Sequence, residues 1–273
     1  MAQNTPMIKA AASAPTTEES PRLWEFEQPL SERMRTFMRL EFLYQQMLYN
    51  SENESDWASR AAIGSLLDIM SILTRGDMRA DIMKELDRQL DLLRRFQEQP
   101  EVDVTRLDSL IRNFSAIRQE LQGVGMNYLQ SIKESEFLGA IKHRSSIPGG
   151  TCEFDLPAYS HWLRQPFDRR RADLLRWLTL IRPICDAVME LLWLIRECAQ
   201  PTRRLAIGGM YQHTMAKDNG CQLIRVSLAP GAPFFPEISG NQHRFTVRFL
   251  EWSSIDSRAT QTGHDVSFRL SLC

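Results

Sequence analysis

The hydrophobic pattern of this chain changes its period at Pro201, and that change limits the folds open to it. Between Leu30 and Ala199, apolar residues recur every three or four positions, as they do on one face of an α-helix. Beyond Pro201 they alternate with polar residues, as in strands with one buried face and one wet face. The pattern therefore predicts an α+β fold, with a mainly helical N-terminal domain of antiparallel helices and a smaller antiparallel β domain at the C-terminus.

Caps and apolar seams place several of the helices. Ser31 is suited to cap the first helix, and Gly76 is suited to end the second. A seam of apolar residues with 3-4-3-4 spacing runs from Leu107 to Leu121. We expect a second seam after Pro183, which we predict to be the first residue of its helix. Narrow seams of this kind are typical of antiparallel helices packed as a bundle.

The strands give the domain boundaries. Residues 223–228, 244–249 and 265–272 alternate between Gly-, Pro- and Asn-rich turns, which indicates an antiparallel sheet. Residues 150–156 also alternate, so we expect a possible outlying strand there that joins the β domain. The predicted division is a disordered tail at 1–23, a helical domain at 24–201 and the β domain at 202–273.

Composition excludes several classes of protein. Lys and Arg number 33 against 34 Asp and Glu, so neither a strongly basic nucleic-acid coat nor an acidic disordered chain fits. No apolar run approaches the roughly 18 residues of a membrane helix, and residues 1–21 contain no signal-peptide core. The five cysteines include no C-x-x-C pair, which favours reduced thiols. We expect a cytoplasmic protein without a membrane partner.

Motifs for catalysis, metals and cofactors are missing from the sequence. It has no nucleophile elbow, phosphate loop, dinucleotide fingerprint or H-E-x-x-H, and its five histidines are scattered. We therefore predict no enzyme activity, no metal site and no cofactor. An enzyme whose site is assembled in three dimensions, from residues such as His161, His243 and Asp265, stays open as an alternative.

Arginine supplies nearly all of the positive charge, with 28 Arg against 5 Lys. Residues 202–273 contain eight basic and five acidic side chains, a net charge of +3. In the alternating register Arg225, Arg244 and Arg248 face outward, and Arg269 lies on the last strand. Such arginines often only solubilise a sheet and protect its edges. Their planar forks also bind carboxylates and phosphates, so the face is a candidate platform for an acidic peptide.

The same face supports an alternative function, a nucleic-acid-binding module. Single-strand binders combine basic grooves with aromatic side chains on which bases stack. Here Phe245, Phe249 and Phe268 fall on the inward register, and the domain is only weakly basic. Nucleic acid is therefore the less favoured partner.

Four groups of residues occur together in an order that is specific to one family. They are Phe26-Glu27-Gln28-Pro29-Leu30 with Arg39-Leu40-Glu41-Phe42-Leu43; Arg75-Gly76 with Lys84-Glu85-Leu86-Asp87-Arg88-Gln89; Ser146-Ile147-Pro148-Gly149-Gly150 with Phe154-Asp155-Leu156-Pro157; and Ile238-Ser239-Gly240 with Arg244-Phe245 and Arg248-Phe249. From about residue 24 to residue 273 the chain resembles the ZapD family of Z-ring-associated bacterial cell-division proteins.

The resemblance implies a non-enzymatic homodimer that binds the C-terminal tail of FtsZ, the tubulin-like division protein, and cross-links its filaments at midcell. It implies binding roles for Arg39, Arg75, Arg79, Arg244 and Arg248. Arg225 joins them because of its place on the predicted sheet. A two-fold dimer has two binding faces, which is the minimum that a cross-linker needs.

Overall fold

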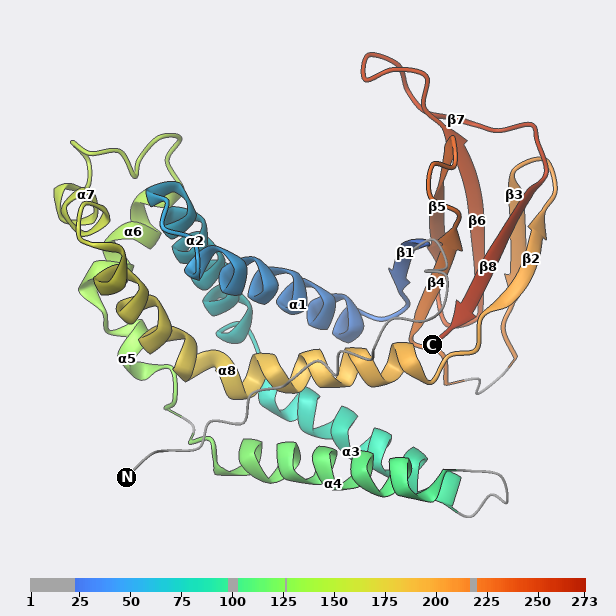
Figure 1. The fold of residues 1–273 in the computed structure, drawn as a ribbon, viewed down its shortest axis with the longest axis horizontal. Coiled ribbons are helices and arrows are strands. Elements are labelled where there is room, and N and C mark those ends of the chain that lie inside the picture. Colours follow the sequence, from blue (N-terminus) through green and yellow to red (C-terminus); the bar gives the residue numbers. More distant parts are fainter. Residues whose placement is uncertain (1–22, 98–102, 126, 217–219) are drawn as a thin grey trace, which may run out of the picture.

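The structure, a computed structural model, describes residues 23–97, 103–125, 127–216 and 220–273 (Figure 1). It contains a helical domain and, beside it, a β domain formed mainly by the C-terminal part of the chain, which confirms the α+β class. The predicted disordered tail at 1–23 lies outside the described residues, apart from Leu23.

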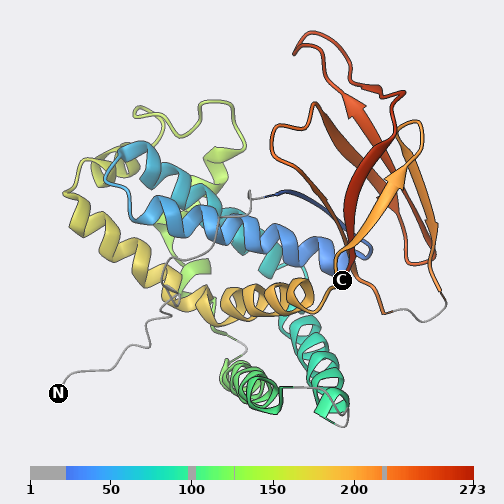
Figure 2. The same cartoon turned by 45° about the vertical axis from the view of Figure 1, so that its right-hand side comes forward.

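The helical domain is built around one long helix. Its helices are α1 (Glu32–Ser51), α2 (Asp56–Leu73), α3 (Met78–Gln97), α4 (Val104–Gly123), α5 (Gln130–Lys133), α6 (Glu136–Ser145), α7 (Pro157–Leu163) and α8 (Phe167–Glu197). The hairpin of α1 and α2 packs on one side of α8, and α3 and α4 lie on the other side (Figures 1 and 2). The Ser31 hydroxyl accepts a hydrogen bond from the Met34 amide at 3.2 Å, which confirms the predicted cap of α1.

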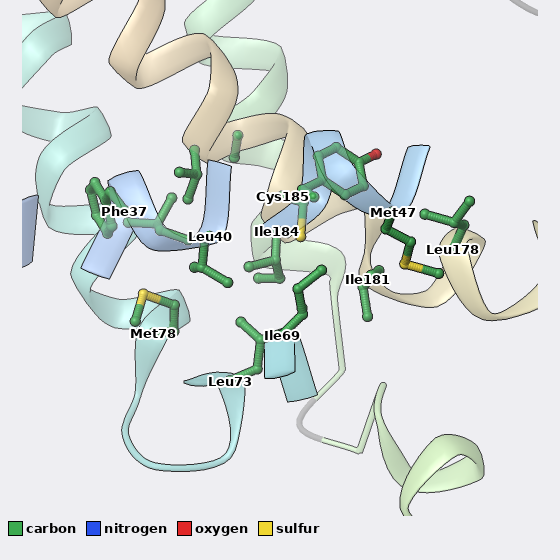
Figure 3. Close-up of a cluster of buried hydrophobic side chains, with 14 of the residues drawn as sticks. Phe37, Leu40, Met47, Ile69, Leu73, Met78, Leu178, Ile181, Ile184 and Cys185 are labelled. Carbon is green, nitrogen blue, oxygen red and sulfur yellow. The ribbon is translucent and has the colours of Figure 1, made fainter. Parts of the chain in front are cut away.

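The core of this domain draws buried side chains from each of the helices named above. Phe37, Leu40 and Met47 of α1, Ile69 of α2 and Ile184 of α8 belong to this cluster, and all five are fully buried (Figure 3). These residues lie on the apolar faces that the spacing predicts. Burying each large aliphatic or aromatic side chain contributes about 1.5–3 kcal/mol. The apolar seams therefore supply most of the free energy that favours packing of the helices.

Pro183 does not open a helix, and that prediction was wrong. It lies inside α8, which runs without a break from Phe167 to Glu197. The buried residues Leu174, Leu178 and Ile181 extend the apolar face on the N-terminal side of Pro183. Their burial outweighs the cost of a proline inside a helix, about 3 kcal/mol.

The β domain is a sandwich of two antiparallel sheets. One has the order β1 (Trp24–Pro29), β4 (Leu223–Leu228), β8 (Val266–Leu272), β2 (Thr202–Ala206); the other has the order β3 (Met210–Thr214), β6 (Arg244–Glu251), β5 (Phe234–Gly240), with β7 (Thr260–Gln261) paired to β6. Val226, Phe245, Phe249 and Phe268 meet in the core between the sheets. The three predicted strands are present as β4, β6 and β8, but they are divided between two sheets.

Two strand predictions need correction. Residues 150–156 form turns closed by local hydrogen bonds, such as that from the Leu156 amide to the Cys152 carbonyl, so no strand forms there. The segment lies at the end of the helical domain remote from the sandwich, where no sheet edge can pair with it (Figure 1). Conversely, Trp24–Pro29, assigned to the helical domain, is a strand that pairs with β4.

A half-buried ionic network joins the two domains. Arg196 of α8 donates to Glu27 of β1 at 2.7 Å and to Glu41 of α1 at 2.5 Å, and Arg225 of β4 donates to Glu27 at 2.9 Å. These four side chains are only 12–18% exposed. Burial acts to raise the pKa of Glu27, but the hydrogen bonds and charges of Arg196 and then Arg225 outweigh it and lower the pKa below its ordinary value.

We expect Glu27→Gln to flatten the acid dependence of stability. The pKa of Glu27 is lower in the folded chain than its ordinary value of 4.5, so the unfolded chain binds more protons between the two values. Its stabilising contribution is complete above pH 4.5 and is lost as the pH falls through the lowered value. Urea denaturation of both proteins at several pH values between about 5 and 3 measures this effect.

Glu120→Gln, which removes an exposed carboxylate of α4 instead, is the control for the loss of one negative charge. If the free energy of unfolding of Glu27→Gln falls with pH as steeply as that of the wild type over this range, protonation of Glu27 does not cause the acid dependence.

Candidate functional site

The six arginines singled out in the sequence lie in four separate places. Arg39 and Arg75 line one groove, and Arg79 lies in the first turn of α3. Arg225 lies in the junction between the domains, and Arg244 and Arg248 lie on the outer face of β6. The structure therefore brings together only two pairs of the six.

The groove that holds Arg39 and Arg75 runs between α1 and α2 and has a volume of about 510 Å³. We call it the arginine groove. Residues three or four apart share one face of a helix, so α1 presents Arg35, Arg39 and Phe42 to it in register. Its lining consists of Pro29, Arg35, Met38, Arg39, Phe42, Leu43, Asp68, Ser71, Ile72 and Arg75.

The charges in the arginine groove are unbalanced. Arg35 pairs with Glu32 on its own helix, whereas neither Arg39 nor Arg75 has an ion pair within the described residues, and both are exposed. Asp68 is the one acidic residue of the lining. Two uncommitted guanidinium forks above an apolar floor are suited to carboxylates that flank an apolar side chain.

The outer face of β6 carries a second basic site. Arg244 and Arg248 are exposed and alternate with buried Phe245, Val247 and Phe249, so they share one face as predicted. Arg248 pairs with Glu237 of β5, which offsets its charge. The Arg244 side chain has no ion pair among the described residues, and it borders a polar depression of about 450 Å³.

Arg225 and Arg79 hold the fold together. Arg225 faces away from the sandwich core, as its register predicts, but that side of β4 is covered because Leu223 packs into the helical core. Its guanidinium binds Glu27 and also lies 3.4 Å from Glu25. Arg79 donates to the Gln122 carbonyl at 3.1 Å, which ties the start of α3 to the end of α4.

Two parts of the site were not predicted from the sequence. Arg35 and Phe42, the latter 65% exposed, complete the arginine groove. Their 4-3 spacing with Arg39 is a signal that could have revealed them, because it places all three on one helix face. Arg75, in the turn after α2, gives no such signal, since only the tertiary structure sets it opposite Arg39.

The remaining sequence alternatives find little support in the geometry. His161 lies on α7, whereas His243 and Asp265 lie in the sandwich domain. Within the described residues, no group of three or more His, Cys, Asp or Glu could hold a metal ion. None of the helices in that part of the chain has both the length and the hydropathy of a membrane span.

Comparison with known proteins decides the family. The model of the cell division protein ZapD matches residues 38–248, a range that includes all six arginines. The chain belongs to the ZapD family. It is 37% identical to the ZapD of Methylococcus capsulatus over 248 residues, which cover 91% of this chain and 97% of that relative.

Other ZapD proteins match to a similar extent. Identity is 37% over 249 residues with the ZapD of Ralstonia nicotianae, covering 91% of this chain and 98% of the relative. Identity is 35% over 248 residues with the ZapD of Aromatoleum aromaticum, and this alignment covers 91% of this chain and 96% of that relative. The resemblance found in the sequence is thus confirmed, and the chain is a cell division protein.

Substitution should separate the structural arginines from the free ones. We expect Arg225→Ala to lower the free energy of unfolding by about 2 kcal/mol, because it removes a partner of the half-buried Glu27. Arg244→Ala should change it by no more than about 0.5 kcal/mol, as is usual for an exposed side chain without a partner. Urea denaturation at neutral pH measures both, and equal effects would contradict this assignment.

Proposed function

We propose that this ZapD-family protein binds the acidic C-terminal tail of FtsZ in the arginine groove. As a homodimer it would cross-link FtsZ filaments and promote Z-ring assembly at midcell. The observation that carries the proposal is the pair of uncommitted guanidinium groups, Arg39 and Arg75, above the apolar floor of one groove. The proposed role is non-enzymatic, because binding and symmetry suffice for it.

The groove favours a weak single contact. Each charge-assisted hydrogen bond contributes about 1.5–3 kcal/mol, and a buried apolar side chain adds a similar amount. Association costs at least about 4 kcal/mol, whereas micromolar affinity requires about 8.2 kcal/mol. Two arginines and one apolar anchor therefore support modest, salt-sensitive binding to an isolated tail.

Attachment of a dimer to two tails of FtsZ filaments compensates for the weak binding of a single tail. A filament displays many tails, and a dimer presents two grooves. Simultaneous attachment raises the apparent affinity by roughly 10²–10⁴ without any new contact. Weak individual sites also let a bundle rearrange while it stays connected. Arg244 on the sandwich, which forms no ion pair in the described part of the chain, offers a further cation for the same acidic tail.

The nucleic-acid alternative lacks a comparable observation. Phe245, Phe249 and Phe268 are at most 3% exposed, so these three rings cannot stack on bases. Binding of single-stranded DNA in a gel-shift assay at physiological salt, without binding of the tail peptide, would favour that alternative.

We expect Arg39→Ala with Arg75→Ala to weaken tail binding at least ten-fold, because both charge-assisted contacts are lost. Fluorescence anisotropy with a labelled FtsZ tail peptide measures the affinity, and light scattering of FtsZ polymer measures bundling. Both signals should fall while the circular dichroism spectrum stays that of the wild type.

Arg94→Ala with Arg95→Ala is the matched control, since it removes the same charge from exposed positions on α3, across α8 from the groove (Figure 2). An equal loss of tail binding in this control would show that the change in net charge, and not the groove, causes the effect. Arg244→Ala with Arg248→Ala tests the sandwich face in the same assay. Loss of binding only in that variant would place the site on β6 and contradict the groove assignment.

A further inference from the structure

Two arginines face each other across neighbouring strands of the sheet β1-β4-β8-β2. Arg203 of β2 lies directly opposite Arg269 of β8 in the antiparallel register, so the two side chains project from the same face. Phe268 and Leu270, the neighbours of Arg269 along β8, are buried in the sandwich core, which places both arginines on the outer face. Both are exposed. We call Arg203 and Arg269 the arginine pair.

The arginine pair contradicts the usual pattern of cross-strand contacts. The Cβ atoms of directly opposite residues lie about 4.5–5.5 Å apart, and like charges placed there destabilise the pairing of the strands. A carboxylate at either position would form a favourable cross-strand ion pair instead. Within the described residues neither side chain of the arginine pair forms an ion pair or a hydrogen bond. Their repulsion is therefore not relieved by that part of the molecule.

The carboxylates that flank the arginine pair along this sheet have other partners. Glu25 of β1 lies two strands from Arg269, which corresponds to about 10 Å. Its ion pair is with Arg225, at 3.4 Å. Asp265, four residues before Arg269, accepts a hydrogen bond from the Gly208 amide at 2.8 Å. Neither carboxylate neutralises the arginine pair.

Protection of a sheet edge explains only half of the arginine pair. β2 ends the strand order, on the side of the sheet away from β1, so its outer side is open to solvent (Figure 1). Edge strands commonly carry charged side chains that prevent pairing with other chains. That role accounts for Arg203. It does not account for Arg269, because β8 is paired on both sides.

The charge of the arginine pair selects the class of ligand. Two adjacent guanidinium groups are neutralised by a group with two negative charges close together. A terminal phosphate group carries a charge of about −1.5 to −2 at pH 7. Its oxygens can accept hydrogen bonds from two guanidinium forks at once. A carboxylate or a phosphodiester carries one charge and would neutralise only one of the two cations.

We propose that Arg203 and Arg269 form a binding site for a terminal phosphate group, such as that of pyrophosphate or of a phosphate monoester. Pairing of β2 with β8 holds the two arginines close together before a ligand arrives, so binding has to order only their side chains. The site is separate from the arginine groove, which lies between α1 and α2. The proposal does not depend on the function proposed above.

The test is Arg269→Glu, compared with the wild type by calorimetric titration with pyrophosphate at constant ionic strength. We expect millimolar affinity for the wild type and at least ten-fold weaker binding for the variant. Without ligand, the urea midpoint of the variant should be higher than that of the wild type, because the introduced carboxylate lies opposite Arg203. A variant that binds less but is more stable has not lost binding through unfolding.

Arg258→Glu is the matched control. It makes the same change of charge at an exposed position in the β6–β7 loop, where Arg258 has no ion pair with any residue that the structure describes. It should keep the wild-type affinity for pyrophosphate and the wild-type urea midpoint.

Two further ligands define the phosphate group that is bound. Dimethyl phosphate, a diester with one charge, should bind the wild type at least ten-fold more weakly than pyrophosphate. A short neutral peptide with one phosphoserine presents the terminal phosphate on a protein chain. Tighter binding of that peptide than of pyrophosphate identifies a phosphorylated protein as the source, and the reverse order identifies a small molecule.

Several outcomes would overturn the proposal. A wild type that does not bind pyrophosphate, or an Arg269→Glu variant that binds it as tightly as the wild type, removes its basis. Equal weakening by Arg258→Glu assigns the effect to net charge, and equal binding of dimethyl phosphate assigns it to a general attraction of anions. If Arg269→Glu loses its circular dichroism spectrum, Arg269→Gln replaces it, and wild-type binding by Arg269→Gln then counts against the site.

The tail-peptide assay separates this proposal from the function proposed above. Unchanged binding of the FtsZ tail peptide by Arg269→Glu, together with loss of pyrophosphate binding, supports a distinct phosphate site. Loss of both ligands in this variant would make the arginine pair a part of the surface that binds the tail, and would contradict a separate site.

Discussion

The arrangement of the two domains depends on Arg196 at the end of α8. Its guanidinium holds Glu27 of the first strand and Glu41 of the first helix, and Arg225 binds Glu27 from the sandwich side. Removing one partner while the others stay half-buried would leave an uncompensated charge, which is strongly destabilising. The network therefore fixes the first strand in the sandwich while the helix that follows it lines the arginine groove.

The arginines of this surface fall into two groups with different roles, according to whether they form an ion pair within the molecule. Arg225 and Arg170 are held by carboxylates inside the molecule and serve the fold. Arg39 and Arg75 lack such partners among the described residues, so their charge is available to a ligand.

Much of the fold follows from local pattern. The periods of 3.6 and 2 gave the α+β class, the cap at Ser31 and strands β4, β6 and β8. The pattern failed at Trp24–Pro29 and at residues 150–156, because short alternating segments become strands only where a sheet edge accepts them. It failed at Pro183 because burial along α8 outweighs the preference of proline for the start of a helix.

The sequence by itself determined the family, the apolar faces and the excess of arginine over lysine. Each of these is carried by residue type and by spacing along a single element. Tertiary structure alone decided which arginines are free, because an ion pair such as Arg225 with Glu27 joins residues 198 positions apart. It likewise set Arg75 across a groove from Arg39 and covered the outward face of β4. Such outcomes depend on which elements pack together, and neither periodicity nor composition encodes that choice locally.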